Sequence, residues 1–100
     1  MLSVAEIKTA VEPIVKDTKV EKLVLFGSYA NGTASENSDI DLYMNSNGAI
    51  TGLAFYELKS QIEDAFDTDI DLLPDLDIIP NSPVERQIDE FGVVIYERQG

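Results

Sequence analysis

Apolar residues recur along the chain with two periods, and each period predicts one kind of element. Spacings of three and four place side chains on one face of a helix, and they predict helices over residues 3–16 and 51–66. Short apolar or alternating runs predict strands, and Gly, Pro, Asn and Ser separate the elements. The other predicted elements are strands over 19–26, 39–44, 68–73 and 93–96, helices over 28–31 and 83–91, and a loop or single turn over 75–82.

The ends of these elements carry their own signals. Ser3 followed by Glu6 has the spacing of a capping box, in which each side chain accepts a hydrogen bond from the other residue's backbone. Pro13 removes a backbone donor, so we expect the first helix to end near Glu12 and resume as a separate turn. In the second long helix, the expected buried residues are Leu53, Phe55, Leu58, Ile62 and Phe66.

Residues 27–44 combine three features of interest. An apolar run ends abruptly at Gly27-Ser28, a polar loop follows, and Asp39-Ile40-Asp41 then alternates acidic and apolar residues. In a strand, this alternation sends both carboxylates to one face, with Cα atoms roughly 6–7 Å apart. Carboxylates at this spacing can share hard cations, and backbone N–H groups at a Gly-Ser turn can bind phosphate. The stretch therefore predicts a site for a metal–nucleoside triphosphate.

Simpler interpretations exist for the same residues. Taken alone, Asp39 and Asp41 could be the solvated face of a strand in an acidic protein. Ser28 could also cap the following helix, a role that is compatible with phosphate binding. The distance between the two motifs favours Asp39 and Asp41 as metal ligands, because ten residues, 29–38, separate Gly27-Ser28 from Asp39-Ile40-Asp41.

This spacing resembles the signature of the DNA polymerase β type of nucleotidyltransferase. The closest similarity is to small single-domain members, the minimal nucleotidyltransferases, many of which serve as the antitoxin of a HEPN-domain toxin. The resemblance implies one domain over residues 1–100 with an α/β (α+β) fold, a small mixed sheet with helices packed mainly on one face. It also implies that Gly27 and Ser28 bind the triphosphate of ATP, while Asp39 and Asp41 bind metal.

The family places a third carboxylate in an apolar-Asp-Leu-apolar run, and residues 70–73 match that pattern. Asp71 is therefore expected to bind the catalytic metal and to help deprotonate the acceptor, with Asp69 as the alternative. The resemblance further implies two Mg²⁺ ions and transfer of AMP from ATP to a hydroxyl, that of a tyrosine, on a HEPN-type toxin in a hetero-oligomer.

One residue departs from the common family pattern. Many members have Arg or Lys where this chain has Asn31, so a cationic contact to phosphate is missing. This favours a second hypothesis, in which the protein is a non-catalytic antitoxin that neutralises its partner by contact alone.

Composition narrows the remaining possibilities. The chain of 100 residues has no Cys and no His, which leaves carboxylates, hydroxyls and lysines for chemistry. A net charge of -12 argues against direct nucleic-acid binding, and it suits cations or a basic partner, or merely aids solubility. No apolar run approaches the roughly 18 residues of a membrane span, and no signal-peptide pattern is present, so we expect a cytoplasmic protein.

Overall fold

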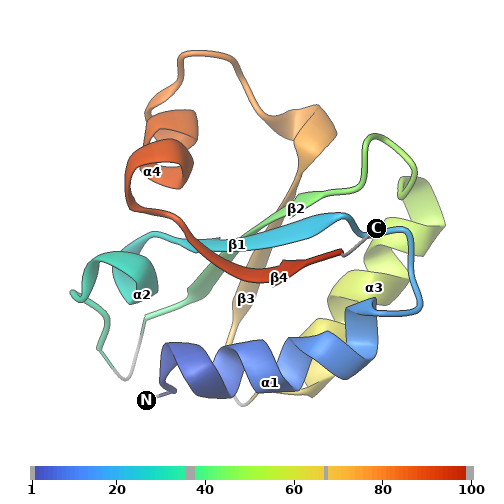
Figure 1. Ribbon diagram of the computed structural model, residues 1–100, viewed down its shortest axis with the longest axis horizontal. Helices are drawn as coiled ribbons and strands as arrows, with labels where there is room; N and C mark the ends of the chain where they lie inside the picture. The colour runs from blue at the N-terminus through green and yellow to red at the C-terminus, as the bar shows by residue number, and fades with distance from the viewer. Residues whose placement is uncertain (1, 36–37, 67, 99–100) are drawn as a thin grey trace.

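A computed structural model describes residues 2–35, 38–66 and 68–98 of the chain. It contains a four-stranded mixed sheet with the strand order β3-β2-β1-β4 (Figure 1). Strand β2 pairs with β3 in parallel and with β1 antiparallel, and β4 is antiparallel to β1. The strands are β1 (Lys22–Phe26), β2 (Ile40–Asn45), β3 (Ile70–Pro74) and β4 (Val93–Glu97).

The two long helices cover one face of this sheet, and a shorter helix lies over part of the other (Figure 1). The long helices are α1 (Val4–Val15) and α3 (Gly52–Asp64), and the shorter one is α4 (Pro83–Phe91). A single-turn helix, α2 (Ser28–Asn31), follows β1, and a 3₁₀ turn, η1 (Asp75–Asp77), follows β3. The predicted α/β fold with helices mainly on one face is therefore confirmed.

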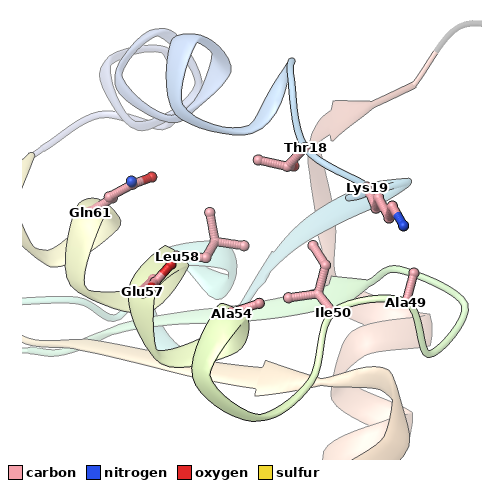
Figure 2. A pocket seen from close by; sticks show the side chains of 8 residues that line it. All are labelled: Thr18, Lys19, Ala49, Ile50, Ala54, Glu57, Leu58 and Gln61. Atoms are coloured by element: carbon pink, nitrogen blue, oxygen red, sulfur yellow. The ribbon is translucent and has the colours of Figure 1, made fainter.

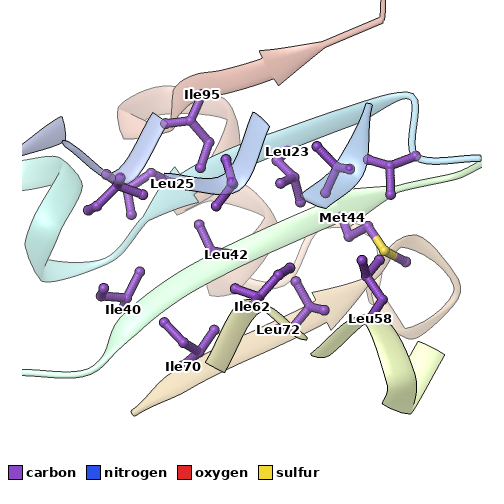
Figure 3. Packing of buried hydrophobic residues seen from close by; sticks show 14 of the residues in the cluster. Leu23, Leu25, Ile40, Leu42, Met44, Leu58, Ile62, Ile70, Leu72 and Ile95 are labelled. Atoms are coloured by element: carbon purple, nitrogen blue, oxygen red, sulfur yellow. The ribbon is translucent and has the colours of Figure 1, made fainter. Parts of the chain in front are cut away.

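The hydrophobic core lies between the sheet and the two long helices (Figure 3). Strand β2 shows how one sequence serves both faces, because Ile40, Leu42 and Met44 are fully buried while Asp41 and Tyr43 alternate with them. Burying each large aliphatic side chain contributes about 1.5–3 kcal/mol, so the apolar positions fix which face of the strand points inward. The polar positions are thereby directed to the opposite face.

Helix α1 begins as predicted but does not break. Ser3 Oγ accepts a hydrogen bond from the Glu6 backbone N–H, and Glu6 Oε1 accepts one from the Ser3 N–H, both at 3.1 Å. The prediction of a break near Glu12 was wrong, because the helix continues through Pro13 to Val15. Pro13 is exposed, while Val11 and Val15 on either side of it are fully buried. Packing on both sides of the proline offsets the backbone hydrogen bond that it removes.

Strand boundaries differ from the prediction where side chains redirect the backbone. Strand β1 begins at Lys22 rather than at residue 19, because the Thr18 hydroxyl donates to the Val15 carbonyl and accepts from the Val20 N–H, which fixes a turn. Strand β3 begins at Ile70 and includes Pro74, which the edge position of this strand permits.

Two further details concern helices. Leu53 was expected in the core but is 77% exposed, at the start of α3. Helix α4 spans the predicted residues, with Ser82 Oγ accepting from the Glu85 N–H. Within the described ranges, no helix combines the length and apolar character needed to cross a membrane.

Candidate functional site

The parallel pairing of β2 and β3 brings two predicted site residues together. Asp41 lies directly beside Asp71 in the register, and Phe26 at the end of β1 lies on its other side. Both acids project away from the core, because their neighbours along each strand are buried. Asp41 is half-buried and Asp71 is exposed, so the pair has one sheltered and one accessible carboxylate.

The Gly27 turn lies against the same carboxylate. Its backbone has φ +73° and ψ -150°, a conformation that is essentially restricted to glycine. A Cβ added at this position would overlap with Asp41 Oδ2 and would lie 3.1 Å from Asp41 Cγ. The structure therefore joins the two halves of the predicted motif, Gly27-Ser28 and Asp41, although residues 36 and 37 between them lie outside the described ranges.

Helix α2 is formed by backbone contacts rather than by a side-chain cap. The N–H groups of Ala30 and Asn31 both donate to the Gly27 carbonyl at 3.1 Å. Gly27 occupies the N-cap position and has no side chain to offer, so the prediction that Ser28 also caps this helix was wrong. Ser28 is the first residue of this helix, where the backbone N–H has no acceptor within the helix.

The electrostatics of Asp41 show which acids surround it. Burial raises the pKa of its carboxyl, and the negative charges of Asp71 and then Asp39 raise this pKa further. Asp39 lies one residue before β2 but is close enough to act on Asp41. The alternative candidate, Asp69, is exposed, and its backbone carbonyl accepts a 3.0 Å hydrogen bond from the Ile40 N–H. The register thus places Asp71, rather than Asp69, beside Asp41.

The donor set suits a hard divalent cation. In the part of the chain that the structure describes, no three acidic side chains converge closely enough to ligate one ion as they stand. Mg²⁺, however, is usually held by one or two carboxylates, with water and phosphate oxygens completing its shell. A cation would also relieve the repulsion that raises the pKa of Asp41. The carboxylates present therefore fit the predicted metal.

Tyr43, two residues after Asp41, lies half-buried on the same face of β2. Burial raises the pKa of its hydroxyl, and nearby Asp75, Asp89 and Glu85 raise it further. The spacing of Glu85 and Asp89, four residues apart on α4, was a signal that both acids could face the sheet together. Negative charges therefore act on Tyr43 as well as on Asp41.

The side chain of Asn31 forms hydrogen bonds within its own loop. Its side-chain oxygen accepts hydrogen bonds from the Thr33 N–H at 3.1 Å and from the Thr33 hydroxyl at 2.6 Å. Gly32 adopts the left-handed conformation that ends α2, with φ +83°. The residue that departs from the family pattern thus stabilises the chain reversal after the Gly27 turn.

A cavity of about 340 Å³ lies elsewhere, between α3 and the loops before β1 and after β2 (Figure 2). Glu57 and Gln61 line it from α3, and Thr18 and Lys19 from the opposite side. None of the predicted site residues borders this cavity, so it is separate from the Asp41–Asp71 site.

Known proteins are similar to this chain in both sequence and fold. The chain is 38% identical over 55 residues to the protein adenylyltransferase MntA of Shewanella oneidensis, a match that covers 55% of this chain and 40% of MntA. It is 31% identical over 99 residues to MJ0126 of Methanocaldococcus jannaschii, provisionally named a protein adenylyltransferase, covering 95% of this chain and 100% of the relative.

A solved structure supports the same relationship. The crystal structure of a toxin–antitoxin with AMP-PNP superimposes with a TM-score of 0.72 and 28% identity, over 92% of this chain and 74% of that one. The family model described as polymerase beta, nucleotidyltransferase, matches residues 8–100. The resemblance seen in the sequence is confirmed, and the chain belongs to the polymerase β nucleotidyltransferase family.

Proposed function

We propose that this protein transfers AMP from ATP to a hydroxyl group of a HEPN-type toxin, a tyrosine hydroxyl, and so acts as its antitoxin. The observation that carries the proposal is the pairing of Asp41 with Asp71 against the Gly27 turn. The similarity to a protein adenylyltransferase and to a toxin–antitoxin with AMP-PNP supports the donor, the acceptor class and the partner.

Each predicted residue has a part in this site. Gly27 and Ser28 hold the triphosphate, since a glycine without Cβ allows close approach and the serine hydroxyl can donate to phosphate oxygen. Asp39, Asp41 and Asp71 hold two Mg²⁺ ions. When bound, such ions stabilise the charge on the attacking and leaving oxygens of an in-line displacement.

The reaction balances with these residues. The acceptor hydroxyl oxygen forms a bond to the α-phosphorus, the bond from that phosphorus to the bridging oxygen breaks, and pyrophosphate leaves. The exposed carboxylate of Asp71 accepts the hydroxyl proton, because it is the more accessible of the paired acids. Asp41, half-buried against Gly27, keeps the donor in place. Since the donor is ATP, we place the protein in the cytoplasm, as a hetero-oligomer with its toxin.

The proposal is tested by intact mass spectrometry of a HEPN-type toxin that is co-expressed with this protein. We expect a mass increase of one or more AMP units with the wild-type protein and none with Asp41→Asn. The folding stability of Asp41→Asn should not fall, because the substitution removes repulsion from Asp71 and Asp39. Asp17→Asn, at an exposed acid in the loop between α1 and β1, is the matched control and should retain transfer.

The other outcomes separate the two hypotheses. If the partner is inhibited but never modified, the hypothesis of a non-catalytic binding antitoxin replaces that of an enzyme. Transfer that persists in Asp41→Asn with excess Mg²⁺ would show that Asp41 is not a metal ligand.

A further inference from the structure

Strand β4 forms one edge of the sheet, and a different helix borders it on each face. Among the described residues, β4 pairs with β1 on one side only. Helix α1 packs against β4 on the core face, and α4 leads into it from the opposite face (Figure 1). The other edge strand, β3, ends in Pro74, which has no backbone N–H to donate, whereas β4 contains neither proline nor lysine. The β4 edge is therefore less protected than β3 against the addition of a further strand.

Two apolar side chains of α4 point toward this edge. Phe91 at the end of the helix is 57% exposed, and Val84 near its start is 40% exposed. They are seven residues apart, which places them within about 20° of each other around the helix axis. Both lie roughly 100–160° around the axis from Glu85 and Asp89, whose charges act on Tyr43 of β2. Phe91 and Val84 are therefore turned away from β2, toward the β4 side of the sheet.

Val94 extends this apolar surface onto the strand. It is 44% exposed, and it pairs with Val24 of β1. A Cβ added at Gly92, the C-cap of α4, would overlap with the Val24 side chain, so Val24 lies beneath α4. Paired residues of neighbouring strands point to the same face of a sheet, which places Val94 on the α4 face. We call Val84, Phe91 and Val94 the apolar flank of the β4 edge.

The α1 side of the same edge carries alternating charges. Lys8, Glu12 and Lys16 follow one another at intervals of four residues, which places them along one side of α1. They line a groove of about 520 Å³ between α1 and β4. Lys22 at the start of β1 and Arg98 just after β4 add two more cations. This edge thus holds four of the seven lysines and arginines of a chain whose net charge is -12.

We propose that two copies of this chain pair through their β4 edges, with the two strands antiparallel and a two-fold axis between them. The apolar flank of each copy packs against that of the other. The two α1 helices then run antiparallel, and an offset of one turn sets Lys8 or Lys16 of one copy opposite Glu12 of the other. Two chains of charge -12 repel each other, and this edge allows them to meet because opposite charges face each other across it.

The helices are needed in this contact because the strand pairing is short. Strand β4 has five residues, and its ladder with β1 shifts register between Leu23 and Val24. Such an irregularity increases the twist of an edge strand and limits the length over which another strand can pair with it. Burial of the apolar flank therefore supplies most of the stabilisation of the dimer. Both nucleotide sites stay open, because β2 and β3 lie on the far side of β1 from the interface.

Sedimentation equilibrium of the purified chain measures this association directly. We expect a dimer of about 22 kDa, twice the 11.0 kDa of one chain. Phe91→Glu puts a charge into the apolar flank and should raise the dimer dissociation constant about 100-fold, since a roughly tenfold effect at one residue occurs twice in a symmetric interface. Leu53→Glu, at a 77% exposed residue of α3, makes the same change in charge and should leave this constant almost unchanged. Circular dichroism checks the folding of each variant, and Val94→Lys provides a second substitution in the flank.

Cross-linking and charge exchange locate the interface. The chain contains no cysteine, so Val94→Cys carries a single thiol, and a short bis-maleimide should link two copies of it. Two copies of Leu53→Cys should not be linked. Glu12→Lys should weaken the dimer, and the further substitution of either Lys8→Glu or Lys16→Glu should restore it, because one of these lysines faces Glu12 of the other copy.

The remaining outcomes overturn the inference. A chain that stays monomeric up to its solubility limit has no such interface. A dimer that is insensitive to Phe91→Glu and Val94→Lys meets elsewhere, and an equal loss from Phe91→Glu and Leu53→Glu reduces the effect to net charge. If Val94→Cys links to a co-expressed toxin instead of a second copy, the edge belongs to the contact with the toxin. The proposed function is tested separately, because it fails only if the toxin remains unmodified.

Discussion

Replacement of Gly27 by alanine tests the contact that joins the two halves of the site. The added methyl group meets the Asp41 carboxylate, and a non-glycine residue at φ +73° and ψ -150° strains the backbone. The strain costs about 1–3 kcal/mol. Overpacking against the carboxylate typically costs a further 1–3 kcal/mol or so. We therefore expect a loss of about 2–6 kcal/mol in the free energy of unfolding, a large part of the roughly 5–15 kcal/mol of a native domain.

Gly32→Ala is the matched control. Gly32 also has a positive φ, +83°, but no atom lies within 4 Å of a Cβ added there. Its cost should be the left-handed backbone penalty alone, about 1–2 kcal/mol. Urea denaturation followed by circular dichroism compares the two variants, with unchanged m-values showing that the folded states are equally compact.

A double-mutant cycle isolates the contact itself. In the background of Asp41→Ala the carboxylate is gone, so Gly27→Ala should lose its overlap with the carboxylate and keep only the cost of the backbone strain, about 1–3 kcal/mol. Strictly additive effects of Gly27→Ala and Asp41→Ala would refute the contact. Nucleotide affinity provides a second readout, because Gly27→Ala should weaken AMP-PNP binding while Gly32→Ala should weaken it less.

Two further predictions concern stability away from the site. Asp75→Ala should lower the free energy of unfolding by about 2–3 kcal/mol, because the Asp75 carboxylate accepts hydrogen bonds from the N–H groups of Ser46 and Gly48. Chemical denaturation measures this loss, with Asp77→Ala, at an exposed acid of the same turn, as the control. Hydrogen bonds from the Ser3 backbone and hydroxyl lower the pKa of Glu6 below 4.5, so this carboxylate stabilises the fold above that pH and its contribution is lost as the pH falls through the lowered value. Glu6→Gln keeps the acceptor without the charge, and its stability deficit should shrink on acidification; a deficit independent of pH would contradict the role of ionisation.

Local signals in the sequence predicted the elements that local contacts form. The capping box at Ser3 and the proline-initiated helix at 83–91 depend on residues within a few positions of each other. The same holds for the short helix at 28–31, which backbone hydrogen bonds to Gly27 and a left-handed Gly32 define. Such elements were predicted correctly because nothing distant competes with them.

Predictions failed where distant residues decide the outcome. Pro13 stays inside a helix because tertiary packing of Val11 and Val15 outweighs its local effect. Asp75 anchors the loop after β2 by accepting hydrogen bonds from Ser46 and Gly48. These residues lie 29 and 27 positions before Asp75 in the sequence, and no local pattern reveals such a contact. The approach of Gly27 to Asp41 also depends on distant residues, through the antiparallel pairing of β1 with β2, but here the spacing of the two motifs had predicted a common site.

The position of the acids follows from the packing of the core. Because side chains alternate along a strand, a shift of one residue in β2 would bury Asp41 and expose Ile40 and Leu42. Burial of these two aliphatic side chains excludes that shift and fixes the face to which Asp41 points. The same holds for β3, where Ile70 and Leu72 are buried on either side of Asp71. The core thus holds two mutually repelling carboxylates side by side, an arrangement that costs stability and that a bound cation would relieve.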